Sequence, residues 1–320
     1  MKRMLCAGAA ATLLVAVAAT SHAQQDIQWK QTINLPKGLN LPKDIIADIL
    51  GIQFGDTYAE AKPKLEKLLA EVRPAAPTAA PAAPNRPLTM GEIEAQRLRT
   101  LEGLERESAN QIAGVNTAPP LTETRTQIRL QAPTGYVTAS FVGTATLRRS
   151  LPGATSQKID DTIRVLFSAP SSGHQVYAVD RFIAYNQADQ PRVGELIARL
   201  KEKFGGDPQT WVAASTGTYK FQFNDGRLHA PPGALQVSCL PFTGADTNQA
   251  ALREINRNGD CDVVLMVEVR YGISKDHAAT IRFAFADNER AKANLGADFA
   301  YFQSYVESLR GQTKGAQPKL

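Results

Sequence analysis

The sequence lacks the short motifs that identify common enzyme classes. It contains no H-E-x-x-H, no G-x-S-x-G, no phosphate-binding P-loop and no S-x-x-K with its companion motifs. Histidine is scarce, and His174, His229 and His277 lie far apart, without the spacing of a metal site on one helix face. We therefore predict no catalytic residue, no metal site and no cofactor. An enzyme would need a site assembled from distant residues.

Long apolar runs and basic clusters are also missing from most of the chain. After Ala23, no hydrophobic stretch approaches the roughly 20 residues that a membrane-spanning helix needs. Lysine and arginine are scattered among acids, whereas nucleic-acid-binding proteins carry a clustered basic surface. The chain is 43% hydrophobic and 21% charged, which is typical of globular proteins. We therefore predict a globular protein that neither spans a membrane nor binds nucleic acid.

The first 23 residues have the pattern of a secretory signal peptide. Lys2 and Arg3 precede an apolar run from 4 to 19, and Ser21-His22-Ala23 forms a small-residue cleavage site. This pattern predicts a periplasmic or secreted protein cleaved after Ala23. Without the two cations of the signal, the formal charge falls from +5 to +3.

The chain has only three cysteines, and Cys6 lies inside the signal, upstream of most of its apolar region. That position does not fit a lipid-anchored cysteine. The other two, Cys239 and Cys261, form an even pair in an oxidising compartment, which favours a disulfide bond. A bridge closing a loop of about 20 residues would stabilise the fold by about 3 kcal/mol. The alternative is a metal or redox pair, but no C-x-x-C spacing or neighbouring histidine supports it.

Aromatic residues are nearly absent from the first part of the chain. Trp29, Phe54 and Tyr58 are the only ones before Tyr136, and the other 19 of the 22 lie from there to Tyr305. Aromatic side chains dominate core burial, so we expect the main core after residue 120. We divide the chain into a signal peptide (1–23), an N-terminal segment with a first helix (24–73), an insertion with a Pro/Ala-rich linker and a charged helix (74–120), a main α+β domain (121–312) and a flexible tail (313–320).

Helices are predicted from capping residues and from apolar residues at helical spacing. Thr57 and Glu60 have the spacing of a capping box for a helix at 57–71, although Pro63 should weaken or kink its first turns. Similar patterns predict helices at 89–112, 191–204 and 289–309. Alternating residues and turn signals predict strands at 126–131, 136–148, 161–169, 175–186, 218–224, 235–239, 263–271 and 279–286.

This order of elements predicts an α+β fold with antiparallel sheets covered by helices. A helix followed by about four strands occurs twice, which suggests two tandem helix-plus-four-strand units. Only the order repeats, and any α+β chain can be divided in this way.

Two acidic stretches are candidate sites. The segment 254–262 has oxygen ligands at alternate positions and Gly259 at the sixth, as in a calcium loop. Leu265 occupies the position of the required glutamate, so a tight turn explains the segment better. Asp160 and Asp161 are neighbours in a predicted strand, where they would point to opposite faces and could not line one cleft.

Aromatic residues are the best candidates for binding contacts. Tyr219 alternates with Phe221 and Phe223, so the three share one face of a strand. Packing beneath the C-terminal helix is the favoured interpretation, with Tyr219 kept as a possible contact. Tyr301 and Tyr305 lie one turn apart, off the main apolar stripe of that helix, and are the better candidates for exposed contacts.

The segment 51–62, Gly-Ile-Gln-Phe-Gly-Asp-Thr-Tyr-Ala-Glu-Ala-Lys, resembles the opening of many exported bacterial modules. These include the small outer-membrane-assembly lipoproteins and proteins of the β-lactamase-inhibitor-protein type, in which a helical unit packs on an antiparallel sheet. The segments 179–183 and 200–205 are similar to uncharacterised exported proteobacterial proteins. The chain departs from these modules at Pro63 and in its long insertion. The resemblance implies a non-catalytic role in binding other proteins.

Together these observations predict an exported, non-catalytic module that binds a periplasmic or envelope protein. A hydrolase with a dispersed site is one alternative. The other is a structural envelope protein, with the insertion as a spacer.

Overall fold

The computed structural model describes residues 25–38, 41–42, 45, 48–72, 119–132, 135–154, 157–229, 239–244 and 261–313. The predicted signal peptide, nearly all of the predicted insertion with its charged helix, most of the predicted strand at 235–239 and most of the segment 254–262 lie outside these residues. Within the described residues, no helix is long and apolar enough to span a membrane.

The described elements follow the predicted order closely. The helices are α1 (Tyr58–Ala70), α3 (Val193–Phe204) and α5 (Asn288–Thr313), with short 3-10 turns η1 (Pro170–Ser172) and η2 (Gln187–Asp189). The strands are β1 (Gln25–Asp26), β2 (Asp48–Ile49), β3 (Ile52–Gln53), β4 (Leu121–Ala132), β5 (Gly135–Pro152), β6 (Lys158–Phe167), β7 (Val176–Ala184), β8 (Gln209–Val212), β9 (Thr216–Asn224), β10 (Arg227–His229), β11 (Val263–Tyr271) and β12 (Ala278–Asp287).

One large sheet holds the fold together, and the prediction of an antiparallel α+β fold is confirmed. Its order is β4-β5-β6-β7-β12-β11-β9, with β8 and β10 both paired to the outer side of β9. The two-residue strand β1 adds a parallel pairing to β5. A helix followed by a strand meander occurs twice, as α1 with β4 to β7 and as α3 with β8 to β12. The two meanders meet where β7 pairs with β12.

The start of α1 shows why this segment is helical. The Thr57 side chain accepts a hydrogen bond from the Glu60 amide while the Glu60 side chain accepts one from the Thr57 amide, so the predicted capping box is present. Ala61, Leu65 and Leu68 then fall on one buried face. Pro63 lies inside the helix, which nevertheless continues to Ala70.

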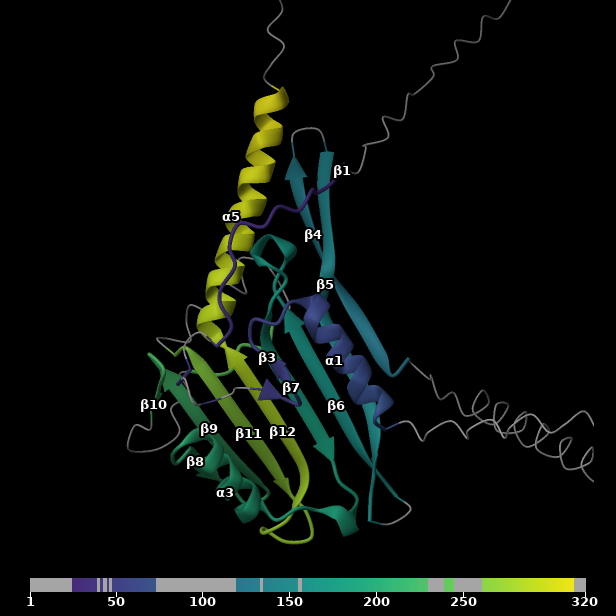
Figure 1. Ribbon diagram of the computed structural model, residues 1–320, viewed down its shortest axis with the longest axis vertical. Helices are drawn as coiled ribbons and strands as arrows, with labels where there is room; N and C mark the ends of the chain where they lie inside the picture. The colour runs from purple at the N-terminus through teal and green to yellow at the C-terminus, as the bar shows by residue number, and fades with distance from the viewer. Residues whose placement is uncertain are drawn as a thin grey trace, which may run out of the picture.

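Helices α1 and α3 pack on the same face of the sheet, which we call the helix face. Their buried residues belong to one cluster with the odd-numbered residues of β6, β9 and β11. In Figure 1 both helices cross the lower part of the sheet, whereas α5 rises along its upper end. Phe204 of α3 lies 5.2 Å from Phe221 and 6.1 Å from Phe285 between ring centroids.

The expectation that α5 covers the strand aromatics is therefore wrong. Phe221 and Phe285 face α3 and Phe54, whose ring centroid is 4.7 Å from that of Phe285. Helix α5 packs on the other face, which we call the opposite face. There Leu295 joins a buried cluster with Leu166 and Ala178. The chain enters α5 directly from β12, and the apolar stripe of the helix turns toward this second face.

Candidate binding surface

Among the described residues, helices α1, α3 and α5 leave the part of the opposite face farther from α5 uncovered. Cross-strand pairing aligns one residue from each of seven strands in a row, which we call the transverse row. From β5 to β8 it consists of Arg148, Thr162, Phe182, Arg282, Glu268, Thr218 and Trp211. All of these side chains point to the opposite face, because residues in register on neighbouring strands share a face.

Burial changes sharply along the strands of this face. Toward α5, the row that contains Leu166, Ala178 and Ala286 is fully buried, and these residues pack against Phe242 and the first turns of α5. At the transverse row, Phe182 is 43% exposed and Trp211 is 53% exposed. The boundary between the part of this face that α5 covers and the part that is exposed therefore lies between the row of Leu166 and the transverse row.

We call the uncovered half the open face. It comprises the transverse row, the residues of the same face between that row and the β11–β12 turn, and two residues of the next row toward α5. These additional residues are Ser150, Lys158, Asp160, Ala184, Thr216, Thr280, Arg270, Arg164 and Asp180.

A ladder of alternating charges crosses the middle of the open face. Arg282 Nε lies 2.9 Å from Asp180 Oδ1, and its Nη1 lies 3.1 Å from Glu268 Oε2. Asp180 Oδ2 also accepts a hydrogen bond from Arg164 Nη2 at 3.1 Å. The hydrogen bond to Asp180 raises the pKa of Arg282, so this guanidinium stays charged. The ladder fixes long side chains in place on an otherwise open surface.

The open face carries more positive than negative charge. Its cations are Arg148, Lys158, Arg164, Arg270 and Arg282, and its acids are Asp160, Asp180 and Glu268. Arg148, Lys158 and Arg270 are exposed. Because these charges are solvent-exposed, the excess gives the open face a positive potential.

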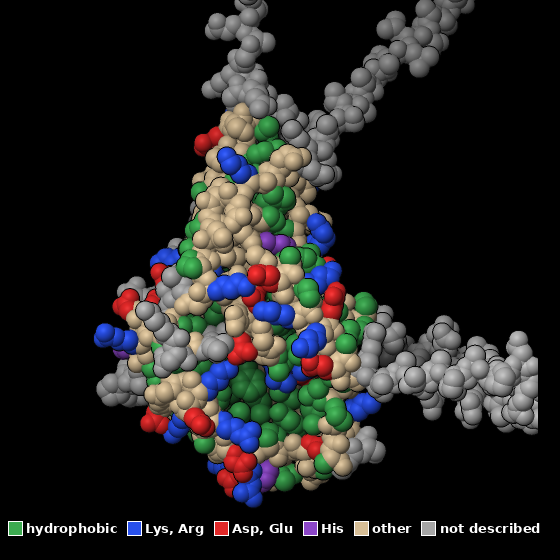
Figure 2. Space-filling model, viewed as in Figure 1, with side chains coloured by type: hydrophobic (Ala, Val, Ile, Leu, Met, Phe, Trp, Pro, Cys, Tyr) green, Lys and Arg blue, Asp and Glu red, His purple; other side chains and the backbone are tan. Residues whose placement is uncertain are grey.

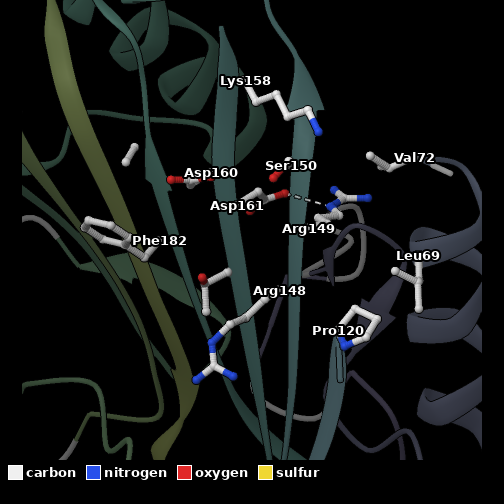
Figure 3. Close-up of a pocket in the computed structure, with 12 residues that line it drawn as sticks. Leu69, Val72, Pro120, Arg148, Arg149, Ser150, Lys158, Asp160, Asp161 and Phe182 are labelled. Carbon is white, nitrogen blue, oxygen red and sulfur yellow. Dashed lines mark hydrogen bonds and ion pairs between the residues drawn. The ribbon is translucent and has the colours of Figure 1, made fainter. Parts of the chain in front are cut away.

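A cavity of about 620 Å³ adjoins the open face at the ends of β5, β6 and β7. Figure 3 shows Phe182 on one side of it and Leu69, Val72 and Pro120 on the other. The ladder between β4 and β5 ends at Leu147, and the Arg148 amide then donates to the Pro120 carbonyl at 2.7 Å. Within the described residues no strand pairs with β5 beyond this point, and the cavity lies along that edge. It is consequently lined from both faces of the sheet.

The acid pair in β6 points to opposite faces, as its alternation predicted. The prediction that the two carboxylates could not line one cleft is wrong, because Asp160 and Asp161 both line this cavity, which is reached from both faces of the sheet. Asp160 is exposed on the open face, whereas Asp161 is fully buried on the helix face. There Asp161 accepts hydrogen bonds from Arg149 Nε and Arg181 Nε, each at 2.9 Å. Figure 3 shows the Arg149 guanidinium directed at Asp161. We call Arg149, Asp161 and Arg181 the arginine–aspartate cluster.

The tyrosines proposed as contacts mostly serve internal packing. Tyr219 is 8% exposed, and burial with a hydrogen bond to Tyr271 raises its pKa to about 12. Tyr301 is stacked on Trp29 with ring centroids 6.3 Å apart, and its hydroxyl donates to the Gln28 carbonyl. Tyr305 is half-buried beside the same cluster. Tyr301 therefore holds the N-terminal segment against α5.

The structure brings the two cysteines together. Cys239 and Cys261 are both buried and form a cluster with Val264, but the structure does not join them in a disulfide bond. Burial is the larger cause and a hydrogen bond with Cys239 the smaller one that together raise the pKa of Cys261 to about 12. Asn288 Nδ2 donates to Cys261 Sγ at 3.4 Å. The disulfide bond stays a prediction.

The histidines do not build a shared site. The ring of His174 stacks on Tyr58 at 4.9 Å, and its Nε2 lies 2.8 Å from the Val142 carbonyl. Burial lowers the pKa of His174. His229 is exposed on β10. His277 Nδ1 lies 2.9 Å from Ser274 Oγ, but this pair closes an exposed turn. The hydrolase hypothesis gains no support from these positions.

Searches with this chain against protein-family models, curated proteins and solved structures find no match. The function is therefore argued from the surface itself. Sequence reasoning missed the open face, although Arg148, Phe182 and Arg270 each adjoin one buried apolar residue of a strand (Leu147, Ile183 and Val269), which was a weak signal for an exposed face. It could not show which half of that face α5 covers.

Proposed function

We propose that the chain is an exported, non-catalytic binding module that holds an acidic surface of a periplasmic or envelope protein against its open face. The observation that carries this proposal is the transverse row, in which Phe182 and Trp211 stand exposed on either side of a fixed charge ladder. Export rests on the signal-peptide pattern of the first 23 residues.

The composition of the row supports protein binding. Aromatic and arginine side chains are enriched in protein interfaces and dominate their binding energy. Arg282 is held by Asp180 and Glu268 before any partner arrives, so less side-chain freedom is lost on association. Small residues such as Thr162, Thr218 and Ala184 between the large ones leave room for a partner's side chains.

Charge argues for an acidic partner. Arg148 and Arg270 are exposed on the open face, Arg148 on β5 beside one end of the ladder and Arg270 on β11, the strand of Glu268 at its other end. An acidic surface that spans the sheet would meet both. Binding should therefore weaken as salt is added, because exposed charge pairs are screened beyond about 10 Å at 0.1 M salt.

Affinity capture from envelope extract of the producing cells, quantified by mass spectrometry, tests the proposal. The wild-type chain should enrich a protein with an acidic surface. Two double variants, Phe182→Ala with Trp211→Ala and Arg148→Glu with Arg270→Glu, should each reduce that enrichment by about tenfold or more, since hot-spot truncations cost about 2 kcal/mol or more.

The matched control is Tyr136→Ala, because Tyr136 is 42% exposed on β5 but lies outside the open face. It should capture the partner as the wild type does. Each variant is first checked for a native melting temperature. If both folded double variants retain the same partner, or the wild-type chain enriches none, the proposal is wrong.

A further inference from the structure

A separate hollow lies on the helix face, on the other side of the sheet from the open face. It has a volume of about 200 Å³ and is lined mainly by apolar side chains, including Ile49 of β2, Leu200 and Phe204 of α3, and Phe283 and Phe285 of β12. Figure 2 shows hydrophobic side chains gathered in this hollow between α1 and α3, with charged side chains around its rim.

The charged residues that line the hollow differ in their ion-pair partners. Lys203 Nζ lies 3.2 Å from Asp48 Oδ1, so these two neutralise each other at the rim. Arg181 belongs instead to the arginine–aspartate cluster, where its Nε and Nη2 both donate to Asp161.

The arginine–aspartate cluster carries one unbalanced positive charge. Asp161 is a single carboxylate shared between Arg149 and Arg181. Arg149 also donates through Nη1 to the Leu68 carbonyl at 3.0 Å, which satisfies hydrogen bonding but not charge. The side chain of Asp161 is fully buried and that of Arg149 is 6% exposed, so water screens this excess charge poorly.

Arg181 connects that charge to the hollow. Its side chain is 17% exposed, the most of the three, and it is the member of the cluster that lines the hollow. An anionic group entering the hollow would therefore meet the cluster at Arg181, next to the aromatic wall formed by Phe283 and Phe285.

We propose that the hollow binds an amphipathic carboxylate, with its apolar body against Phe204 and Phe283 and its carboxylate on Arg181. The volume is below the roughly 300–1,000 Å³ of sites for drug-sized ligands, so a short apolar body fits best. Octanoate, a free fatty acid with a tail comparable to one long side chain, is the probe of this chemistry. The site is independent of the proposed binding partner.

Isothermal titration calorimetry on the full chain distinguishes the contributions of charge and tail. We compare octanoate with 1-octanol, which has the same tail and no charge, and with octylammonium, which has the opposite charge. Octanoate should bind about tenfold or more tightly than 1-octanol, as expected for a hydrogen bond to a charged group. Octylammonium should bind most weakly.

Two variants locate the ligand. Arg181→Met leaves Arg149 paired with Asp161, so the buried charges balance and the fold should persist. Arg181→Met should lower the affinity for octanoate to that for 1-octanol. Its affinity for 1-octanol should stay within about twofold of the wild-type value. Leu200→Trp should fill the hollow and weaken both ligands. The control, Arg148→Met, removes one positive charge from the open face instead. It should change the affinity for neither octanoate nor 1-octanol.

The proposal fails if the folded wild-type chain binds no octanoate, or binds octanoate and 1-octanol equally. It also fails if folded Arg181→Met keeps the preference for octanoate. Melting temperatures of the three variants, measured alongside, separate loss of the site from loss of the fold.

Discussion

Ser171 donates a hydrogen bond from its hydroxyl to the carboxylate of Asp298 at 2.6 Å, which joins the turn after β6 to the middle of α5. The same carboxylate accepts the Ala169 amide at 3.0 Å. Asp298 is fully buried, and this burial raises its pKa from 3.8 to about 6 despite the hydrogen bonds. The main contact between α5 and η1 therefore contains a titrating group.

We predict that Asp298 makes the protein less stable as pH rises. Because its folded-state pKa is raised, its contribution is fully present below pH 3.8 and is lost as pH rises through about 6. Between pH 4 and 7, the stability of wild type relative to Asp298→Asn should fall by about 2 kcal/mol, measured by urea unfolding. The lowered pKa of His174 acts in the opposite direction but is common to both proteins, so it cancels. A pH-independent difference would contradict the assignment.

In the arginine–aspartate cluster, we predict that removing the aspartate costs more stability than removing one arginine. Asp161→Ala leaves two guanidinium groups facing each other in a buried site, and should destabilise the fold by about 3–5 kcal/mol. Arg181→Met keeps Arg149 paired with Asp161 and should cost clearly less. Chemical unfolding of both variants at one pH makes the comparison. Equal losses would show that the carboxylate does not organise the cluster.

The cysteine pair predicts a covalent difference between oxidised and reduced protein. Cys239 and Cys261 are buried neighbours, so oxidation should link them, and non-reducing mass mapping of protein isolated without reductant should give one linked peptide pair. The bridge should add about 3 kcal/mol to the free energy of unfolding compared with reduced protein. Two unlinked cysteines in protein isolated without reductant would refute it.

The local elements were predictable because their signals are short-range. Thr57 with Glu60 predicts where α1 begins, Gly205 in a left-handed conformation ends α3, and Asp225-Gly226, a pair typical of hairpin turns, connects β9 to β10. Strands β8 and β10 were missed, since each has only three or four residues and pairs with β9 alone.

The functional surfaces were not predictable because they depend on register and on the choice of face. Phe182 and Phe283 both alternate within strands, yet one is exposed on the open face and the other lines the hollow on the helix face. Nothing local to these residues shows that α5 covers only the upper half of the opposite face. The charge ladder likewise joins residues from β6, β7, β11 and β12.

The pairing of β7 with β12 has a consequence for how the chain matures. Ile183 in β7 finds its partner, Ile281, in the last strand of the sheet. Until that strand has been synthesised and delivered, the inner edge of the first meander offers unpaired amides and carbonyls to any neighbouring chain. Folding of this protein thus depends on its C-terminal end, and a truncation before residue 278 should leave an aggregation-prone edge rather than a smaller stable unit.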